Sequence, residues 1–283
     1  MKALILGAGG QVGRALAAAL PDATALTRRE CDIADAAGTG LHWSAYDTVV
    51  NAAAFTDVDG AETVQGRPVA WRANAEGPAV LAALARRHDL TLVHLSSEYV
   101  FDGRSPQPYA EDDPVAPLSA YGASKAAGDL AVRTADRHYI IRPTWLVGDG
   151  RNFVRTMLTL ATKEVEPTVV VDQVGRPTFA AEIAAAIVEL VGARAPYGTY
   201  NLTGGGEPTS WAEVARATYE LAGRADLTVH ETTTAAYFAD KPGAARRPLN
   251  GVLDLSKARR AGVPPRPWRE SLAGYVAAAV SGS

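Results

Sequence analysis

The sequence has very few of the residues from which disulfides and metal clusters are built. It contains one cysteine, Cys31, among 283 residues. A single cysteine forms no internal disulfide, so we expect a reducing compartment. The histidines are scattered, without the spacing that metal ligands show. They stand at His42, His88, His94, His138 and His230. We therefore predict no metal site.

Long apolar runs and a strong net charge are also missing. The run Ala3-Leu4-Ile5-Leu6 ends at Gly7, which makes it too short for the core of a signal peptide or for a membrane span. The net charge of −3 creates no strong field for nucleic acid. Hydrophobic residues make up 47% and charged residues 21% of the chain, as in ordinary globular proteins. We expect a cytoplasmic protein with no nucleic-acid or membrane partner.

What the chain does have is a regular alternation of short apolar runs and helical patterns. Strands joined by helices of this length pair in parallel through right-handed crossovers. Continuous apolar strands are typical of a sheet covered on both faces. The sequence therefore predicts an α/β fold with a Rossmann-like, doubly wound parallel sheet. The predicted strands are 2–6, 23–26, 47–51, 90–95 and 139–141, and the helices are 11–20, about 65–88 and about 120–136.

The alternation weakens after Val147-Gly148-Asp149-Gly150, where prolines and glycines become dense. We predict a cofactor-binding domain over 1–148 and a smaller C-terminal substrate-binding lobe over 149–283, with 172–192 packing back on the first domain. In this part the predicted helices are 153–162, 179–191 and 211–221, the strands are 168–171 and 200–202, and 232–248 is a loop.

A glycine-rich loop, Gly7-Ala-Gly-Gly10-Gln-Val-Gly13, lies between the first strand and the first helix. In a dinucleotide-binding loop, such glycines permit the tight turn, the approach of backbone amides to a pyrophosphate, and close helix–strand packing. The strand–loop–helix context favours cofactor binding over an ordinary turn. We predict that Gly7, Gly10, Gln11, Val12 and Gly13 contact the cofactor.

The residues after the second strand indicate which dinucleotide binds. An NAD-type fold places an acidic residue there for the ribose 2′-hydroxyl, whereas this chain has Thr27-Arg28-Arg29. Arginine suits a 2′-phosphate through charge-assisted hydrogen bonds. We therefore predict NADPH with Arg28 as its contact, and Glu30 keeps NADH open as an alternative. Asp32 and Ile33 are predicted to complete this side of the site.

Tyr121 and Lys125 stand four residues apart in a predicted helix, so they share one face. A lysine ammonium favours the phenolate form and is expected to lower the pKa of Tyr121. A tyrosine tuned in this way can exchange a proton with a carbonyl or an alcohol. The spacing alone is also typical of a surface lysine beside an amphipathic tyrosine, so its meaning depends on the other motifs.

Those motifs together resemble the extended short-chain dehydrogenase/reductases and, within them, the dTDP-4-dehydrorhamnose reductases. The resemblance extends over essentially the whole chain. Besides the glycine loop and Tyr121-Gly-Ala-Ser-Lys125, it rests on Asn51-Ala-Ala-Ala-Phe-Thr-Asp-Val-Asp-Gly-Ala-Glu62, Ser96-Ser-Glu-Tyr-Val-Phe-Asp-Gly103, Arg142-Pro-Thr-Trp-Leu-Val-Gly148, Asp172-Gln-Val-Gly-Arg-Pro-Thr178, Arg247-Pro-Leu-Asn250 and Pro267-Trp-Arg-Glu-Ser-Leu272.

The resemblance implies an NADPH-dependent reduction of the C4 ketone of a dTDP-4-keto-6-deoxyhexose. It implies that Tyr121 donates the proton, that Lys125 lowers the pKa of that tyrosine and holds the nicotinamide ribose, and that Ser97 hydrogen-bonds the carbonyl oxygen. Asn74 matches an asparagine that supports the lysine through water. A homodimer is a further expectation from the family.

The resemblance also implies contacts around the ligands. Ala52, Ala53 and Ala54 are expected to line the cofactor. The positions that match sugar contacts are Val58, Glu98, Tyr99 and Trp145, although Trp145 fits a core aromatic residue equally well.

Two departures from the family pattern concern the substrate. Glu98 stands where aspartate is usual, and Arg176 stands where a small residue is usual. We expect Arg176 either to reach a nucleotide phosphate or to point into solvent. The longer carboxylate and the extra cation leave the identity of the sugar open.

Three alternatives stay open from the sequence: a reductase of another dTDP-4-keto deoxysugar from a secondary-metabolite pathway, a sugar-nucleotide dehydratase or epimerase, and a non-catalytic NADP-binding regulatory subunit. A dehydratase needs a further acid–base pair, and Glu98 is followed by Tyr99. The acidic group Asp57, Asp59 and Glu62 is expected to be a solvated or capping face rather than a cation site.

Overall fold

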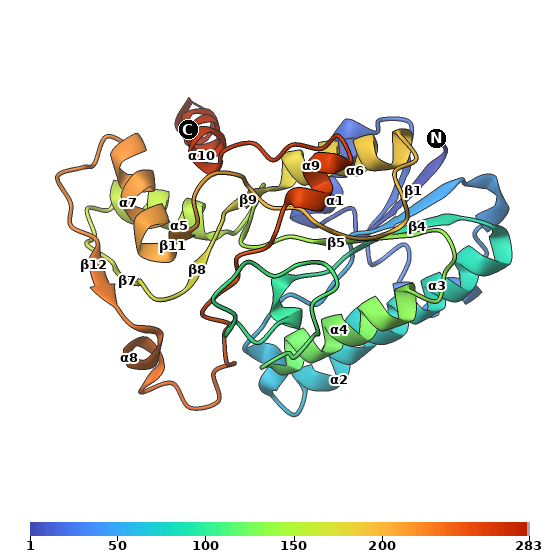
Figure 1. The fold of residues 1–283 in the computed structure, drawn as a ribbon, viewed down its shortest axis with the longest axis horizontal. Coiled ribbons are helices and arrows are strands. Elements are labelled where there is room, and N and C mark those ends of the chain that lie inside the picture. The colour runs from blue at the N-terminus through green and yellow to red at the C-terminus, as the bar shows by residue number, and fades with distance from the viewer. Residues whose placement is uncertain (282–283) are drawn as a thin grey trace.

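A six-stranded parallel sheet forms the centre of the N-terminal part of the protein, in a computed structural model that describes residues 1–281 (Figure 1). Its strand order is β2–β1–β3–β4–β5–β10. In the shared register, Ile5 lies opposite Ala25 on one side and Val50 on the other. The strands are β1 (Ala3–Leu6), β2 (Thr24–Leu26), β3 (Thr48–Asn51), β4 (Thr91–Leu95), β5 (His138–Arg142) and β10 (Gly198–Asn201).

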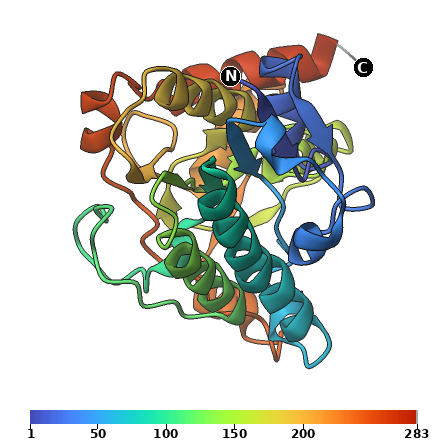
Figure 2. The ribbon, with the colours of Figure 1, turned by 90° about the vertical axis from the view of Figure 1, so that its right-hand side faces the viewer.

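Helices cover both faces of this sheet. Because successive strand residues point to opposite faces, Ile5 packs in one core with α1 (Gln11–Ala19) and α6 (Ala180–Gly192). Leu4 and Leu6 pack in the other core with α3 (Gly77–His88) and the end of α4 (Ala120–Val132). Figure 2 shows α3 and α4 side by side, in teal and green. Burial on both faces explains why the strands are continuous apolar runs.

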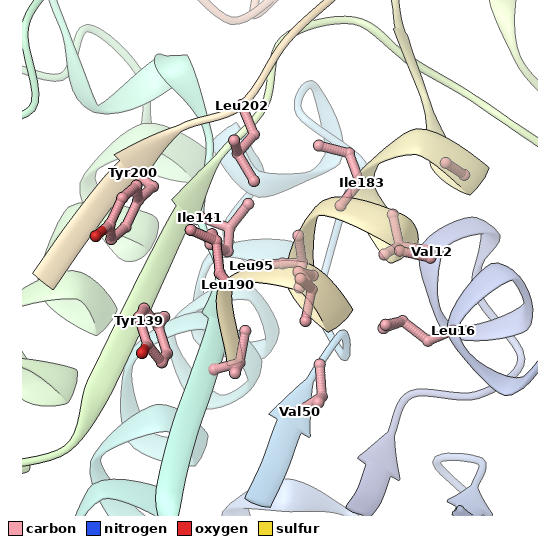
Figure 3. Close-up of a cluster of buried hydrophobic side chains, with 14 of the residues drawn as sticks. Val12, Leu16, Val50, Leu95, Tyr139, Ile141, Ile183, Leu190, Tyr200 and Leu202 are labelled. Carbon is pink, nitrogen blue, oxygen red and sulfur yellow. The ribbon is translucent and has the colours of Figure 1, made fainter. Parts of the chain in front are cut away.

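The core between the sheet and α1 and α6 is drawn in Figure 3. Val12 and Leu16 reach it from α1, and Ile183 and Leu190 reach it from α6. α6 therefore packs on the central sheet of the N-terminal part, although it lies beyond residue 148. β10 goes further, since it extends the sheet by pairing with β5. The domain boundary itself stays a prediction, and residues 282–283 of the predicted lobe lie outside the described residues.

The C-terminal part is built from short strand pairs and helices, most of which lie on the left of Figure 1, whereas α9 lies near α6. α5, α7 and α10 pack around two smaller apolar cores. The strand pairs are β6 (Leu146–Val147) with β9 (Thr178–Phe179), β7 (Thr168–Val170) with β12 (His230–Thr232), and β8 (Val174–Gly175) with β11 (Thr209–Ser210). The helices are α5 (Phe153–Thr162), α7 (Trp211–Leu221), α8 (Thr234–Phe238), α9 (Ser256–Arg260) and α10 (Trp268–Ser281).

The doubly wound sheet is confirmed, and several details differ from the sequence prediction, among them the short strands β6, β8, β9, β11 and β12, which were not predicted. The helix expected over about 120–136 ends at Val132. The predicted loop 232–248 contains α8, which Thr233 caps by accepting a hydrogen bond from the Ala236 N–H at 3.2 Å. α9 and α10 had no counterpart among the predicted helices. Within residues 1–281, no helix is both long and apolar enough to cross a bilayer.

Candidate active site

The site begins where the sheet reverses its winding. The chain leaves β1 for β2 on one side and then returns to β3 on the other side, and ligands of such sheets bind in the crevice at this point, beyond the carboxyl ends of the strands. Gly7 follows β1 with φ of +84°, a conformation that favours glycine. A Cβ atom on Gly7 would lie 2.5 Å from the Ala53 nitrogen. The two strand ends therefore meet only because Gly7 has no side chain.

The start of α1 packs just as closely, since a Cβ atom on Gly13 would lie 2.2 Å from the Gly7 carbonyl oxygen. This is the helix–strand packing that the sequence predicts for the third glycine. Val12 is buried in the core, and the Gln11 side chain donates to the Arg151 carbonyl at 3.4 Å. Gln11 and Val12 can therefore meet a cofactor through backbone N–H groups, which at a helix N-terminus suit a phosphate.

A cavity of about 390 Å³ lies at this point. It unites most of the residues that the sequence assigns to the cofactor, and its glycine wall leaves room for a pyrophosphate beside the α1 N-terminus. The cavity fits a dinucleotide in shape and in the chemistry of its lining. The lining residues are Gly7, Gly9, Gly10, Arg28, Cys31, Asp32, Ile33, Ala52, Ala53, Ala54, Phe55, Thr56, Asp57, Val69, Arg72 and Ala73.

Arg28 and Glu30 differ in their availability to a cofactor. The Arg28 side chain is largely exposed at the cavity and lies 3.8 Å from the Asp32 carboxylate. The Glu30 carboxylate accepts hydrogen bonds from the Thr27 N–H and the Thr27 hydroxyl, both at 2.8 Å. These hydrogen bonds lower the pKa of Glu30. Glu30 is thus engaged within its own turn, whereas Arg28 lines the cavity and its side chain is largely exposed.

Tyr121 is held in the first turn of α4 by two capping contacts. The Ser119 hydroxyl accepts from the Gly122 N–H at 3.1 Å, and the Glu62 carboxylate accepts from the Ala120 N–H at 2.7 Å. Both satisfy helical N–H groups that lack a partner in the helix. Glu62 is therefore a capping residue, as expected of the acidic group. The contact also fixes α4 to the loop after β3.

The pKa of Tyr121 moves in the opposite direction from the sequence prediction. Burial raises it first and the neighbouring Glu98 carboxylate raises it further, while the nearby Ser97 hydroxyl lowers it. Lys125 does not offset this, because its ammonium donates to the Leu95 carbonyl and lies near the Asp129 carboxylate. Burial lowers the pKa of Lys125 itself to about 8.

Ser97 and Glu98 follow the carboxyl end of β4. The Ser97 hydroxyl accepts from the Tyr99 N–H at 3.2 Å and donates to the Glu98 carboxylate at 2.7 Å. Burial raises the pKa of Glu98 to about 7. Two oxygen groups able to exchange protons therefore lie together at the end of a central strand.

Asn74 is fully buried in a single π-helical turn, Arg72–Glu76, between α2 (Gly66–Trp71) and α3. Such turns inside helices are frequent at functional sites. Its amide oxygen accepts from the Phe55 N–H at 2.9 Å, and its amide nitrogen donates to the Phe55 carbonyl and the Ser124 hydroxyl, both at 3.0 Å. Asn74 therefore joins the loop after β3 to the helix that carries Tyr121.

The predicted sugar contacts divide into two groups. Val58 and Tyr99 pack in one apolar cluster with Tyr121, and the Tyr99 and Tyr121 rings meet edge to face with centroids 5.4 Å apart. Trp145 instead stacks on Trp211 in the C-terminal part, with ring centroids 3.9 Å apart. The structure thus joins Val58, Glu98 and Tyr99 to Tyr121 and gives Trp145 a separate aromatic partner.

Arg176 takes neither orientation expected from the sequence. Its guanidinium donates to the Gly206 carbonyl at 2.8 Å and to the Leu253 carbonyl at 3.2 Å, so it neither points into solvent nor keeps these donors for a phosphate. Burial lowers its pKa. Arg176 therefore fastens three backbone segments of the C-terminal part together.

Sequence reasoning missed a buried polar group behind Lys125. Asp129 accepts from the Arg142 guanidinium at 3.1 and 3.2 Å, and its other oxygen lies 4.0 Å from the His94 ring. The signal was available, because Asp129 stands four residues after Lys125 on the same helix face. The missing information was which cation the strands would bring to it.

A second missed contact joins the two parts of the chain. The Asp59 carboxylate accepts from the Ala245 N–H at 2.9 Å and pairs with the Arg247 guanidinium at 2.8 Å. Asp57 caps a turn by accepting from the Gly60 N–H at 2.9 Å. The acidic group is therefore used for capping and pairing. Within residues 1–281, no group of three or more acidic, histidine or cysteine side chains is arranged to hold a metal ion.

Known proteins similar in sequence show the family to which the chain belongs. A model described as the RmlD substrate binding domain matches residues 1–281. The chain belongs to this family. Among its relatives, the dTDP-4-dehydrorhamnose reductase of Aggregatibacter actinomycetemcomitans is 38% identical over 289 residues, covering 95% of this chain and 96% of the relative. The spore coat polysaccharide biosynthesis protein SpsK of Bacillus subtilis is 38% identical over 283 residues, covering 97% and 96%.

This RmlD family member has the same fold as solved dTDP-4-dehydrorhamnose reductases. A dTDP-4-dehydrorhamnose reductase from Clostridium acetobutylicum superimposes with a TM-score of 0.90 at 34% identity, covering 98% of each chain. The Bacillus anthracis dTDP-4-dehydrorhamnose reductase in complex with NADP gives a TM-score of 0.85 at 32% identity, covering 97% of this chain and 98% of that one. The resemblance to the extended short-chain dehydrogenase/reductases is thereby confirmed.

Proposed function

We propose that the protein is an NADPH-dependent reductase that converts dTDP-4-dehydrorhamnose to dTDP-rhamnose by reducing the C4 ketone. The observation that carries the proposal is the position of Tyr121, which packs on Tyr99 beside the hydrogen-bonded Ser97 and Glu98, at the carboxyl edge of the sheet that also holds the dinucleotide-shaped cavity. Relatives 37–39% identical and matched over nearly their whole length bear the name dTDP-4-dehydrorhamnose reductase.

In this proposal the bound dinucleotide supplies the hydride, and the protein supplies orientation and a proton. The Tyr121 phenol donates its proton to the carbonyl oxygen as negative charge develops there. The Ser97 hydroxyl stabilises the same charge from a fixed position. Lys125, whose pKa burial lowers to about 8, is proposed to hold the ribose. Asn74 keeps the helix of Tyr121 in register with the cofactor loop.

NADPH is proposed over NADH because of Arg28. Arg28 lines the cavity beside Asp32, where an arginine suits a 2′-phosphate. Glu30, the residue that favoured NADH, is already bound to Thr27. The NADP complex of the Bacillus anthracis relative supports the same choice.

Turnover tests the proposal directly. The protein is mixed with dTDP-4-keto-6-deoxyhexoses and with NADPH or NADH in parallel, cofactor oxidation is followed by absorbance, and the product is identified by NMR. The expected result is oxidation of NADPH only in the presence of the keto sugar, with dTDP-rhamnose as product. Tight NADPH binding without oxidation by any 4-keto sugar would exclude the reductase and favour a regulatory subunit.

A second candidate is the reduction of a different dTDP-4-keto deoxysugar. Glu98 stands in place of the usual aspartate and is buried against Ser97, so the sugar pocket differs where selectivity is set. A relative from Streptomyces antibioticus, 38% identical over 282 residues, is named as a probable dTDP-4,6-dihydroxy-2-methyloxan-3-one 4-ketoreductase. Faster turnover of a 2-deoxy sugar in the same assay would favour this candidate.

A further inference from the structure

A chain of three buried oxygen groups leads away from the proposed proton donor. The Ser97 hydroxyl acts on the Tyr121 phenol and lowers its pKa, and it donates to the Glu98 carboxylate at 2.7 Å. Tyr121 is 8%, Ser97 6% and Glu98 4% exposed. The chain therefore connects a phenol to a carboxyl group without passing through bulk solvent.

Glu98 is buried without a compensating cation among residues 1–281, where it forms no ion pair. Burial raises its pKa to about 7. Its side chain packs against the backbone of Gly251, where an added Cβ atom would lie 3.3 Å from the Glu98 Cγ. A carboxyl group removed from water and left without a cation favours its protonated form.

Ser97 is suited to pass a proton in either direction. A serine hydroxyl has one hydrogen and two acceptor positions, and the hydrogen rotates to the better acceptor. When Glu98 is ionised, Ser97 donates to it and accepts from Tyr121. When Glu98 carries a proton, Glu98 donates to Ser97, and the Ser97 hydrogen is available first to the carbonyl oxygen and then, once Tyr121 has given up its proton, to the phenolate. Both states keep the same heavy-atom positions.

We propose that Glu98 stores the proton that replenishes Tyr121 after each reduction. The inference rests on the proposed reductase function. The carbonyl carbon gains a hydride, and its oxygen takes the Tyr121 phenol proton. The resulting phenolate takes the Ser97 proton while Ser97 takes the Glu98 proton. The Glu98 carboxylate left behind is reprotonated from water after product leaves, so each turnover consumes one solvent proton.

Other titratable groups around Glu98 also contribute to the pH dependence of the reaction. Tyr99 and Tyr121 lie beside it, and burial raises the pKa of both. On α4, Lys125 has a pKa lowered to about 8 and lies near Asp129. A second inflection from Lys125 is therefore expected in any pH profile, about one pH unit above that of Glu98.

The test compares Glu98→Gln and Glu98→Asp with the wild type. A matched control is Glu182→Gln, because Glu182 in α6 also accepts a hydrogen bond from a serine, Ser271, and burial also raises its pKa. Infrared spectroscopy of the NADP-bound proteins follows the protonated carboxyl band as pH is raised. The pH dependence of kcat is measured on the same samples.

The store must be protonated to act, so wild-type kcat is expected to fall about tenfold per pH unit above about pH 7. Glu98→Gln is expected to lose this inflection, to keep the one near pH 8, and to show a kcat about 10- to 100-fold lower at pH 6. Glu98→Asp and Glu182→Gln are expected to keep the inflection. The carboxyl band that titrates near pH 7 is expected to vanish only in Glu98→Gln.

Two results overturn the inference while the proposed function stands. One is an active wild type without the titrating carboxyl band. The other is a Glu98→Gln variant with an unchanged pH profile and only a raised KM, which makes Glu98 a sugar contact. Absence of turnover by a wild type that binds NADPH overturns the proposed function instead.

Discussion

Replacing Asn74 with alanine tests whether this residue holds the site together by direct contacts. The change removes hydrogen bonds to the Phe55 N–H, the Phe55 carbonyl and the Ser124 hydroxyl. Phe55 is partly buried, so water reaches it incompletely, and each lost bond costs about 1 kcal/mol. The free energy of unfolding is therefore expected to fall by about 3 kcal/mol.

The expected shift in Tm follows from the size of the chain. An unfolding entropy of about 2 cal/mol/K per residue gives about 0.6 kcal/mol/K for this protein, so a loss of about 3 kcal/mol lowers Tm by about 5 °C. Phe55 also lines the cofactor cavity, and its displacement is expected to weaken NADPH binding several-fold. Calorimetry and NADPH fluorescence titration measure the two effects.

Ser124→Ala is the matched control for this experiment, because it removes only one of the three Asn74 hydrogen bonds, together with the hydrogen bond from Ser124 to the Tyr121 carbonyl. It is expected to lower Tm by about 3 °C and to leave NADPH affinity unchanged, since the Phe55 contacts with Asn74 remain. Equal Tm shifts in the two variants, with wild-type NADPH affinity in Asn74→Ala, would refute the reasoning.

Three further changes have definite expected outcomes. Tyr121→Phe is expected to remove most turnover and to change NADPH affinity only a few-fold; turnover near wild type would exclude Tyr121 as the proton donor. Lys125→Met is expected to abolish turnover yet raise the free energy of unfolding at pH 7 by about 2 kcal/mol. Keeping Lys125 protonated in the fold, where its pKa is lowered from 10.5 to about 8, destabilises the wild type by about 3 kcal/mol, and its hydrogen bond to the Leu95 carbonyl offsets about 1 kcal/mol of this. Between pH 8 and 10.5, Lys125 is protonated in the unfolded chain but not in the folded protein, so the stability of the wild type rises with pH relative to that of the variant. The difference in Tm between the variant and the wild type is therefore expected to narrow, and a constant difference would contradict this. Arg28→Ala is expected to raise KM for NADPH at least tenfold and to leave KM for NADH nearly unchanged, and equal changes for both cofactors would contradict a contact with the 2′-phosphate.

The sequence predicted the features that depend on local patterns. Strands such as β1 and helices such as α5 are visible because their periodicity is set by neighbouring residues. Gly7 and Gly13 could be interpreted because their close contacts lie within one strand–loop–helix unit. Val58 and Tyr99 were assigned through the family resemblance, and the structure brings them to Tyr121.

The features that the sequence could not give depend on contacts between distant segments. The pKa of Tyr121 follows from burial and from Glu98, and the orientation of Arg176 follows from two carbonyls 30 and 77 residues away along the chain. The Asp59–Arg247 pair spans 188 residues. Periodicity and spacing carry no information about such partners, so the electrostatics of the site had to come from the fold.

The late position of β10 also matters while the protein is being made. β5 pairs with β10 through Tyr139 to Arg142, but roughly sixty residues separate the two strands, which at 5–20 residues per second corresponds to about 3 to 12 s of synthesis. During that interval the nascent chain presents an unpaired strand edge and, before α6 is complete, an uncovered apolar face on α1. Before β10 has been made, the ribosome-bound chain therefore exposes surfaces that chaperones bind and from which aggregation starts.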